Sequence, residues 1–320
     1  MGYDPEGYLF LGDPDQLCPH VQGKGAAKGG MRRSLMQRFL SVGVSQARLF
    51  LQYRYKEPIA DCLRLLHYGS ELLQDAPAVC NRPGLSNLQA CPHVFFFATD
   101  GEEKEKEEGG TPSGSNEEEA EIAVSAVERL VAMMPKEDPK QSDKERSKAA
   151  KHPATVDASG CRLWGLKDIT VLTGYASQKA LIRRKLNEKG LHDVAVENVD
   201  SFQGQQSEIV VFTNVRAAPE SVIEEYTKAP TTARREEMSR DAVGSSTNLA
   251  RLIVALSRAK EHLILIGNAH TLRVFGSLLA IILNHALRIP GHGVPRGVGA
   301  GQRGSRGSGG RSECHPDRHS

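Results

Sequence analysis

Arg54 is the residue whose place in this sequence most directly suggests chemistry. It lies in the loop QYRYKEP, directly after the apolar run ARLFL (47–51), which predicts a strand. Ligand sites form at the carboxyl ends of parallel strands, and a guanidinium can hold phosphate oxygens in bidentate fashion. Arg54 is therefore a candidate phosphate ligand, and a local ion pair with Glu57 is the alternative.

Two other loops place amide and glycine residues after apolar runs or in turns. Gln16 lies in GDPDQLCP, after the run YLFLG (8–12), and its carboxamide can donate and accept a hydrogen bond at once. Gly204 lies in VDSFQGQQSE (199–208), where the absence of a side chain lets the backbone approach a partner closely. The alternative for Gln16 is a simple loop amide that satisfies backbone groups.

Expected strands and helices alternate along most of the chain. This alternation predicts βαβ units and a parallel sheet covered by helices on both faces. The expected strands are 8–12, 47–51, 93–100, 168–175, 193–199, 208–215 and 262–268. The expected helices are 32–40, 58–66, 117–134, 177–190, 248–260 and a last one after 270.

Three stretches interrupt or follow this pattern with polar composition. Residues 101–116 predict a solvated loop, and 135–160 a disordered, charged insertion. Residues 217–247 predict a second polar insertion. The tail at 289–320 is rich in Gly and Arg and cannot bury enough apolar surface to fold alone. It is either a weak RNA-binding segment or a linker.

Five segments, in order, resemble the later motifs of the superfamily 1 helicases, in the branch of the up-frameshift and Dna-two-like helicases. They are GDPDQLCP, LQYRYKEP, TGYASQ, VDSFQGQQSE and LIVALSRAK. The resemblance covers roughly residues 8–271. It implies an α/β fold, a RecA-like sheet of the P-loop NTPase type flanked by helices.

The resemblance also implies a division of the chain into three parts. Residues 1–44 would be the C-terminal remnant of a first RecA-like domain, and 45–288 the second RecA-like domain. That domain would carry the insertions at about 101–160 and 217–247. Residues 289–320 would be the disordered tail.

The motifs assign roles in ATP hydrolysis to three residues. Arg258, in LIVALSRAK, matches the arginine finger that stabilises charge on the γ-phosphate. Arg54 matches a phosphate ligand, and Gln16 matches a sensor of the γ-phosphate. Arg251 is about two helical turns before Arg258, so we expect both on one face of a helix.

The motifs assign nucleotide and nucleic-acid contacts to five more residues. Gly204 and Gln206 match positions beside the nucleotide, although the family usually has Glu where this sequence has Gln206. An amide there keeps a hydrogen bond and loses the charge. Thr173, Gln178 and Ser201 match contacts to the sugar-phosphate backbone of single-stranded RNA or DNA, with turn and cap roles as alternatives.

The sequence contains no G-x-x-x-x-G-K-[ST] loop and no acidic magnesium motif, the Walker A and Walker B elements of such enzymes. We therefore expect the chain to begin near the end of the first RecA-like domain. ATP with Mg²⁺ would then need ligands from that missing part, and the chain alone would have no ATPase activity. The alternatives are a non-catalytic RecA-like module that binds RNA or protein, and an unrelated nucleotide-binding α/β enzyme.

Composition argues against several other classes of protein. The six cysteines include no C-x-x-C pair, which argues against a disulfide framework and leaves no predicted metal site. There is no signal peptide and no apolar run long enough to span a membrane, so we expect a cytoplasmic or nuclear protein. The net charge of +2 does not by itself indicate a nucleic-acid partner.

Overall fold

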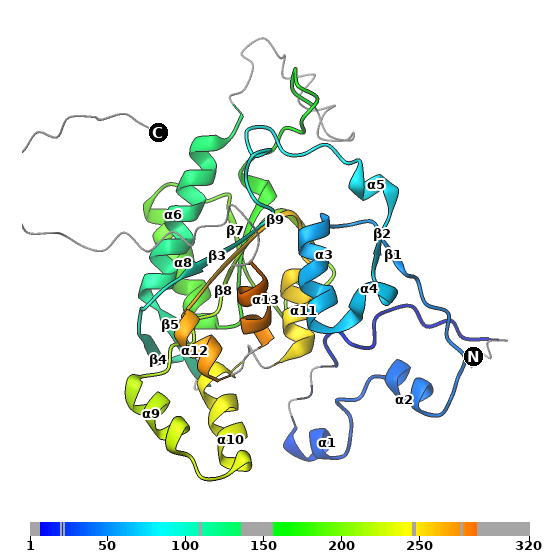
Figure 1. Cartoon of the computed structure of the whole chain (residues 1–320), viewed down its shortest axis with the longest axis vertical. Coiled ribbons are helices and arrows are strands. Elements are labelled where there is room, and N and C mark those ends of the chain that lie inside the picture. The colour runs from blue at the N-terminus through cyan, green and yellow to red at the C-terminus, as the bar shows by residue number, and fades with distance from the viewer. Residues whose placement is uncertain are drawn as a thin grey trace, which may run out of the picture.

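A parallel sheet of five strands forms the centre of the protein (Figure 1). The computed structural model describes residues 7–19, 21, 23–108, 111–135, 156–244, 248–275 and 278–286. The strands lie in the order β3-β9-β8-β6-β7 and are all parallel. They are β3 (Val94–Ala98), β6 (Ile169–Thr173), β7 (Ala195–Asn198), β8 (Ser207–Thr213) and β9 (Ala259–Gly267). The expected parallel α/β fold is confirmed.

Both faces of the sheet are buried because successive residues of a strand point to opposite sides. In β8, Val210 packs in one hydrophobic cluster and Val211 in the other. All five residues of β6 are buried. Continuous apolar runs such as ITVLT are therefore compatible with a strand that is covered on each side.

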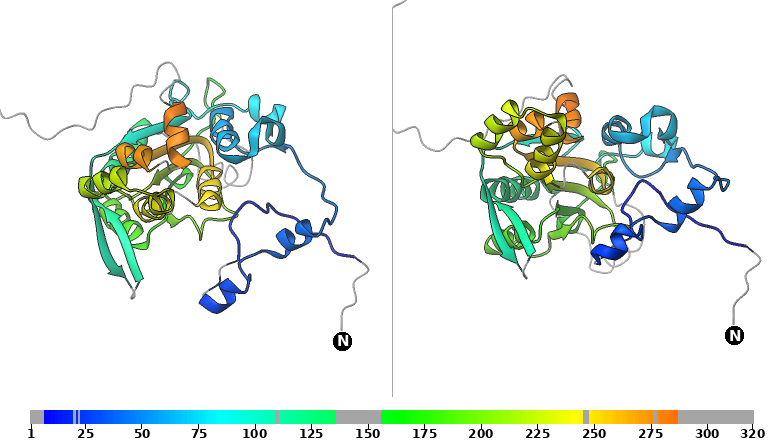
Figure 2. Two further views of the ribbon diagram at one scale, coloured as in Figure 1. Left: turned by 60° about the horizontal axis from the view of Figure 1, so that its bottom comes forward. Right: turned by 90° about the horizontal axis from the view of Figure 1, so that it is seen from below.

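Helices cover the two faces separately (Figures 1 and 2). The helices α6 (Glu117–Met133) and α8 (Ala176–Glu188) pack on one face. The other face is covered by α3 (Glu57–Leu63), α11 (Leu249–Leu256), α12 (Ala269–Val274) and α13 (Leu278–Ala286). Asn248 caps α11 by accepting a hydrogen bond from the Arg251 N–H, 3.0 Å away.

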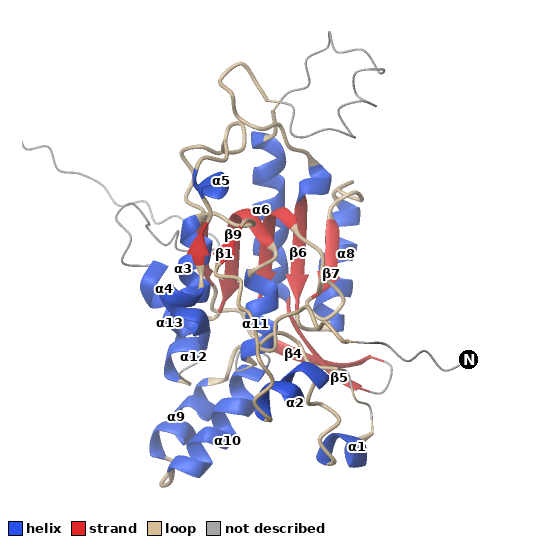
Figure 3. Ribbon diagram, turned by 90° about the vertical axis from the view of Figure 1, so that its right-hand side faces the viewer, coloured by secondary structure: helices blue, strands red, loops and turns tan. Residues whose placement is uncertain are grey.

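Residues 101–116, expected to be a solvated loop, form a β-hairpin instead, so that prediction is wrong. The antiparallel strands are β4 (Glu103–Glu108) and β5 (Thr111–Asn116), and Figure 3 shows them beyond one end of the central strands. The Gln178 side chain accepts from Asn116 N at 2.8 Å and donates to Asn116 O at 3.2 Å. This paired amide ties the hairpin to α8, a long-range contact that polar composition does not reveal.

Residues 217–247, expected to be a polar insertion, contain two helices, α9 (Glu220–Lys228) and α10 (Thr232–Val243). Ile223 and Val243 are buried against the same core cluster as α11. The ring of Tyr226 lies 4.7 Å from that of Phe275, measured between centroids. This helical pair therefore shares the main core.

The first fifty residues contain less regular structure than the sequence predicted. The run 8–12 forms no strand, and Tyr8, Leu9 and Leu11 are exposed. The strand expected at 47–51 is reduced to β1 (Leu51–Gln52), which pairs in parallel with β2 (Gln74–Asp75). Both predictions were wrong because an apolar run becomes a strand only where a neighbour completes its hydrogen-bond ladder. The helices α1 (Lys24–Lys28) and α2 (Leu35–Ser41) complete this part.

Residues 84–87 form a corner of the molecule that contacts the described residues before and after 136–155. The Ser86 N–H donates to Arg162 O at 2.8 Å, and the Arg162 N–H donates to Gly84 O at 2.9 Å. The Asn87 side chain donates to Met133 O at the end of α6, 3.0 Å away. The chain thus leaves and re-enters the fold at one place. Most of the insertion predicted at 135–160 lies outside the described residues, as does the tail at 289–320.

The remaining elements are short. Between α3 and β2 lie a π-helical turn (Arg64–Tyr68) and α4 (Gly69–Leu72). The other two are α5 (Pro77–Cys80) and a 3₁₀ turn (Leu166–Asp168). Across the described helices, none combines the length and apolar content that a membrane span requires.

Candidate phosphate-binding cleft

An open cleft of about 1370 Å³ lies between the first fifty residues, the segment that includes α3 and α4, and the end of α11. Gln16, Arg54 and Gln206, three of the residues that the sequence singled out, line it together. Ser257 and Lys260, which follow α11, also line it. Segments that are distant in the sequence therefore build one cavity.

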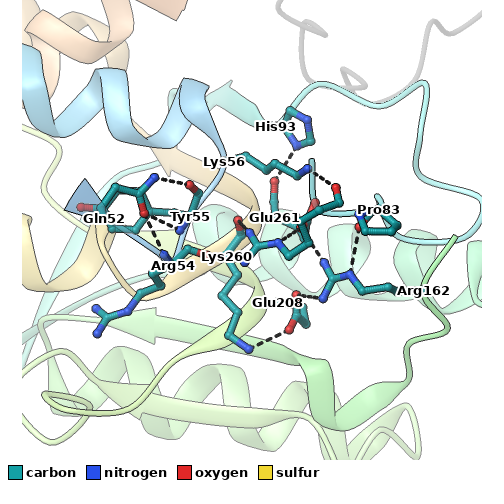
Figure 4. A network of polar contacts seen from close by, with 11 residues as sticks. Gln52, Arg54, Tyr55, Lys56, Pro83, His93, Arg162, Glu208, Lys260 and Glu261 are labelled. Atoms are coloured by element: carbon teal, nitrogen blue, oxygen red, sulfur yellow. Dashed lines mark hydrogen bonds and ion pairs between the residues drawn. The ribbon is translucent and has the colours of Figure 1, made fainter. Parts of the chain in front are cut away.

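The loop that carries Arg54 is fixed by the side chain of Gln52. The Gln52 Oε1 accepts hydrogen bonds from the N–H of Arg54 (2.8 Å) and of Tyr55 (3.0 Å). Its Nε2 donates to Tyr55 O at 2.7 Å and to Asp75 Oδ1 at 2.5 Å. Figure 4 shows the Arg54 side chain pointing away from these contacts. The backbone is thus anchored while the guanidinium extends toward the cleft.

The Arg54 guanidinium has no carboxylate partner among the described residues. Its Nη1 donates to the main-chain oxygen of Ser257 at 3.2 Å. The described structure contains no ion pair between Arg54 and Glu57, the alternative considered from the sequence. A cation held by one neutral acceptor retains the capacity to bind an anion.

Arg258 is the largest of the fully buried side chains, with 2% of its surface exposed. Its Nε donates to Val254 O (3.0 Å), its Nη1 to Gln205 O (3.1 Å) and its Nη2 to Ser257 Oγ (2.7 Å). Burial, and then the nearby charge of Arg54, lower the pKa of Arg258 to about 10. No described carboxylate forms an ion pair with it.

The structure therefore brings the two predicted arginines together at Ser257. Arg54 contacts the carbonyl of this residue and Arg258 contacts its hydroxyl. Arg258 is not among the residues that line the cleft, and its side chain is buried behind Ser257, which does line it. Arg251 has a different partner, Asp200, which it contacts through two nitrogens at 2.9 Å each.

The amide and glycine candidates occupy distinct positions. The Gln16 Nε2 donates to Asp13 Oδ2 at 3.0 Å, within the cleft. Gln206 lines the cleft directly after Gln205, whose carbonyl accepts from Arg258. Gly204 has a positive φ of 85°, which favours glycine, but lies outside the residues that line the cleft.

The three candidates for nucleic-acid contact do not share one exposed surface. Thr173, at the end of β6, and Gln178 are both fully buried. Ser201 is exposed, and its hydroxyl donates to Asn198 O at 2.9 Å. Of the three, Ser201 alone is at the surface of this structure, and a nucleic-acid role for each stays a prediction.

Sequence reasoning missed a network of charged side chains beside the cleft (Figure 4). The network consists of Lys56, Arg82, Arg162, Glu208, Lys260 and Glu261. Two members of this network, Arg82 and Lys260, line the cleft. The other charged lining residues are Arg48, Arg54, Asp13 and Asp15, so cations outnumber carboxylates at the cleft wall. Glu208 and Lys260 lie in the quoted motifs, but Arg82 and Arg162 lie in segments without a recognisable pattern.

Comparison with known proteins identifies the family. A family model described as an AAA domain matches residues 31–270, three quarters of the chain. The chain belongs to this family. It is a superfamily 1 helicase sequence of the up-frameshift/Dna-two-like branch, as its motifs indicated.

Curated relatives of this AAA-domain chain carry helicase and RNA-processing names. It is 28% identical over 277 residues to the 3'-5' exoribonuclease HELZ2 of Mus musculus, which covers 84% of this chain and 8% of that protein. It is 26% identical over 302 residues to Helicase sen1 of Schizosaccharomyces pombe, an alignment that covers 90% of this chain and 15% of that protein. It is 25% identical over 272 residues to the Regulator of nonsense transcripts 1 homolog of Drosophila melanogaster, an alignment that covers 82% of this chain and 19% of that protein. The chain thus spans less than a fifth of each of these relatives.

Proposed function

We propose that this chain is the C-terminal motor part of an ATP-dependent superfamily 1 RNA or DNA helicase. Arg258 would act as the arginine finger and Arg54 as a phosphate ligand. The observation that carries the proposal is the pair of guanidiniums that meet at Ser257 without a carboxylate partner among the described residues. A phosphate group would supply the missing negative charge.

Phosphoryl transfer requires mostly positioning and neutralisation of charge, and the arginines can provide both. Arg258 is held by three neutral oxygens. A phosphate oxygen that replaced one of them would form a charge-assisted hydrogen bond, roughly twice as strong as a neutral one. To reach a γ-phosphate, the Arg258 side chain would have to leave part of this buried set of acceptors, one of which, Val254 O, belongs to α11.

The remaining parts of the ATPase site would come from elsewhere. Walker A and Walker B are absent from this sequence, so we propose that a first RecA-like domain supplies the phosphate cradle and the ligands of Mg²⁺. Bound Mg²⁺ would neutralise charge on the β- and γ-phosphates. Gln16 would report the state of the γ-phosphate, and Gln206 would contact the nucleotide through its amide.

The nucleic-acid contacts are part of the same proposal. Thr173, Gln178 and Ser201 would contact the backbone of a single strand, and the loop at Gly204 would link that track to the nucleotide. Gln178 is engaged with Asn116 in this structure, so its part in the track would require a rearrangement of the hairpin.

Binding of inorganic tripolyphosphate to the full chain tests the proposal. Isothermal titration should show that Arg54→Ala weakens binding about tenfold or more, since a hydrogen bond to a charged group contributes roughly 1.5–3 kcal/mol. Arg183→Ala is the control, because Arg183, on α8, donates to Val194 O at 2.7 Å and is not among the residues that line the cleft. Equal affinity of Arg54→Ala and wild type would contradict the proposal.

A second measurement separates the motor from a binding module. The purified chain should show no steady ATP turnover. Single-strand binding that weakens with salt and does not respond to nucleotide would favour a non-catalytic RNA-binding module instead.

A further inference from the structure

Arg82, which follows α5, contacts the loop that carries Arg54 and the start of β9, which follows Arg258. Its Nη1 donates to the main-chain oxygen of Arg54 at 2.7 Å. Its Nη2 donates to the main-chain oxygen of Lys260 at 3.0 Å, two residues after Arg258. One planar guanidinium thus joins two segments that are distant in the sequence.

The backbone of Arg82 is itself held by the Arg54 loop. Lys56 donates through Nζ to Arg82 O, and the Lys56 N–H donates to Lys260 O at 2.9 Å. Burial lowers the pKa of Lys56, and the nearby Glu261 opposes this effect. The contacts between these segments are therefore reciprocal.

Glu261 fixes the direction of the Arg82 side chain. It is fully buried, and its Oε1 accepts from Arg82 Nε at 2.8 Å and from Arg162 Nη2 at 2.5 Å. Arg162 continues to Glu208 at 3.0 Å, and Lys260 contacts the same carboxylate at 2.8 Å. The network therefore reaches β8, whose start follows Gln206.

We propose that Arg82, oriented by Glu261, is a positioning residue that sets Arg54 in place to bind phosphate. This inference rests on the proposed function of Arg54. Arg82 bonds the carbonyl of Arg54 itself, so a displacement at that atom moves the guanidinium that faces the cleft. A lysine could not take over the role, because an ammonium lacks the planar fork that reaches two carbonyls and a carboxylate at once.

A double-mutant cycle on the full chain tests this coupling, with inorganic tripolyphosphate as the probe. Arg82→Lys should weaken tripolyphosphate binding about tenfold, and in the Arg54→Ala background the same substitution should have no further effect. Glu261→Gln should weaken binding in the same Arg54-dependent way. Arg183→Lys, which alters a guanidinium bound to carbonyls away from the cleft, should leave affinity unchanged.

The outcomes separate this inference from the proposed function. If Arg54→Ala weakens binding while Arg82→Lys and Glu261→Gln do not, the positioning role is wrong and the phosphate site stands. Equal losses from Arg82→Lys with and without Arg54 would show direct action by Arg82 and would also overturn the inference. If Arg54→Ala has no effect, both proposals fail. If circular dichroism shows that Arg82→Lys is unfolded, the double-mutant cycle of Glu261→Gln with Arg54→Ala decides whether the positioning role holds.

Discussion

Glu119, in the first turn of α6, should make the stability of this protein fall as the pH rises. Its side chain is fully buried, and its Oε2 accepts from the Val215 N–H at 2.8 Å. Its Oε1 has no hydrogen-bond partner among the described residues. Burial raises the pKa of Glu119 to about 8, against the lowering effect of hydrogen bonds from the backbone of Asn214 and Val215.

The magnitude follows from linkage between protonation and folding. A pKa raised from 4.5 to about 8 on folding corresponds to about 5 kcal/mol of unfolding free energy. The folded protein keeps a proton that the unfolded chain releases. The stability is therefore fully present below pH 4.5 and is lost as the pH rises to about 8. About 2 kcal/mol of that loss falls between roughly pH 6 and pH 8.

Glu119→Gln removes this titration while keeping an acceptor for the Val215 N–H. Urea unfolding at pH 6 and pH 8 should show a loss about 2 kcal/mol larger for wild type than for the variant. The matched control is Glu121→Gln, on the same helix, because Glu121 is exposed and pairs with Lys185 at 3.3 Å. Parallel pH dependence of wild type and Glu119→Gln would refute the argument.

Three further predictions concern other described residues. Burial raises the pKa of the Cys62 thiol to about 12, so Cys62 should resist a thiol reagent at pH 8 until urea unfolds the chain. The exposed Cys18 should react at once. Labelling of Cys62 before unfolding, read by mass spectrometry, would contradict this. Asn248→Ala removes the cap of α11 and should cost about 1 kcal/mol in urea unfolding. In Gly204→Ala, the added Cβ would have no described atom within 4 Å, so the loss of about 1 kcal/mol in unfolding free energy should come from the positive φ alone. A much larger loss in thermal unfolding would contradict this.

The sequence predicts the central sheet well because its strands are apolar on both faces. Runs such as ITVLT and HLILIG can be satisfied only in a covered sheet, and β6 and β9 lie there. The prediction fails for YLFLG (8–12), which is also an apolar run but has no neighbouring strand among the described residues. It also fails for the hairpin β4–β5, whose polar residues are ordered by strand pairing and by Gln178. The composition of a segment indicates whether its side chains will be buried. Whether the segment pairs as a strand depends on partners that are distant in the sequence.

The candidate site was predictable in part for a similar reason. Arg54 and Arg258 stand out because each lies in a recognisable segment near an expected strand, and the structure places both at Ser257. Arg82 could not be found in this way, because its partner Glu261 is 179 positions away. Side chains that position others carry no local pattern, since their contacts are created by the fold.

The corner formed by Gly84, Asn87 and Arg162 has a consequence for changes in chain length. Because Met133 and Arg162 contact neighbouring residues there, the segment between them closes a loop whose ends are already fixed. Lengthening a closed loop costs free energy only logarithmically, about 0.6 kcal/mol for each doubling. This segment is therefore a natural place to graft a fluorescent domain or an affinity tag without disturbing the register of the sheet.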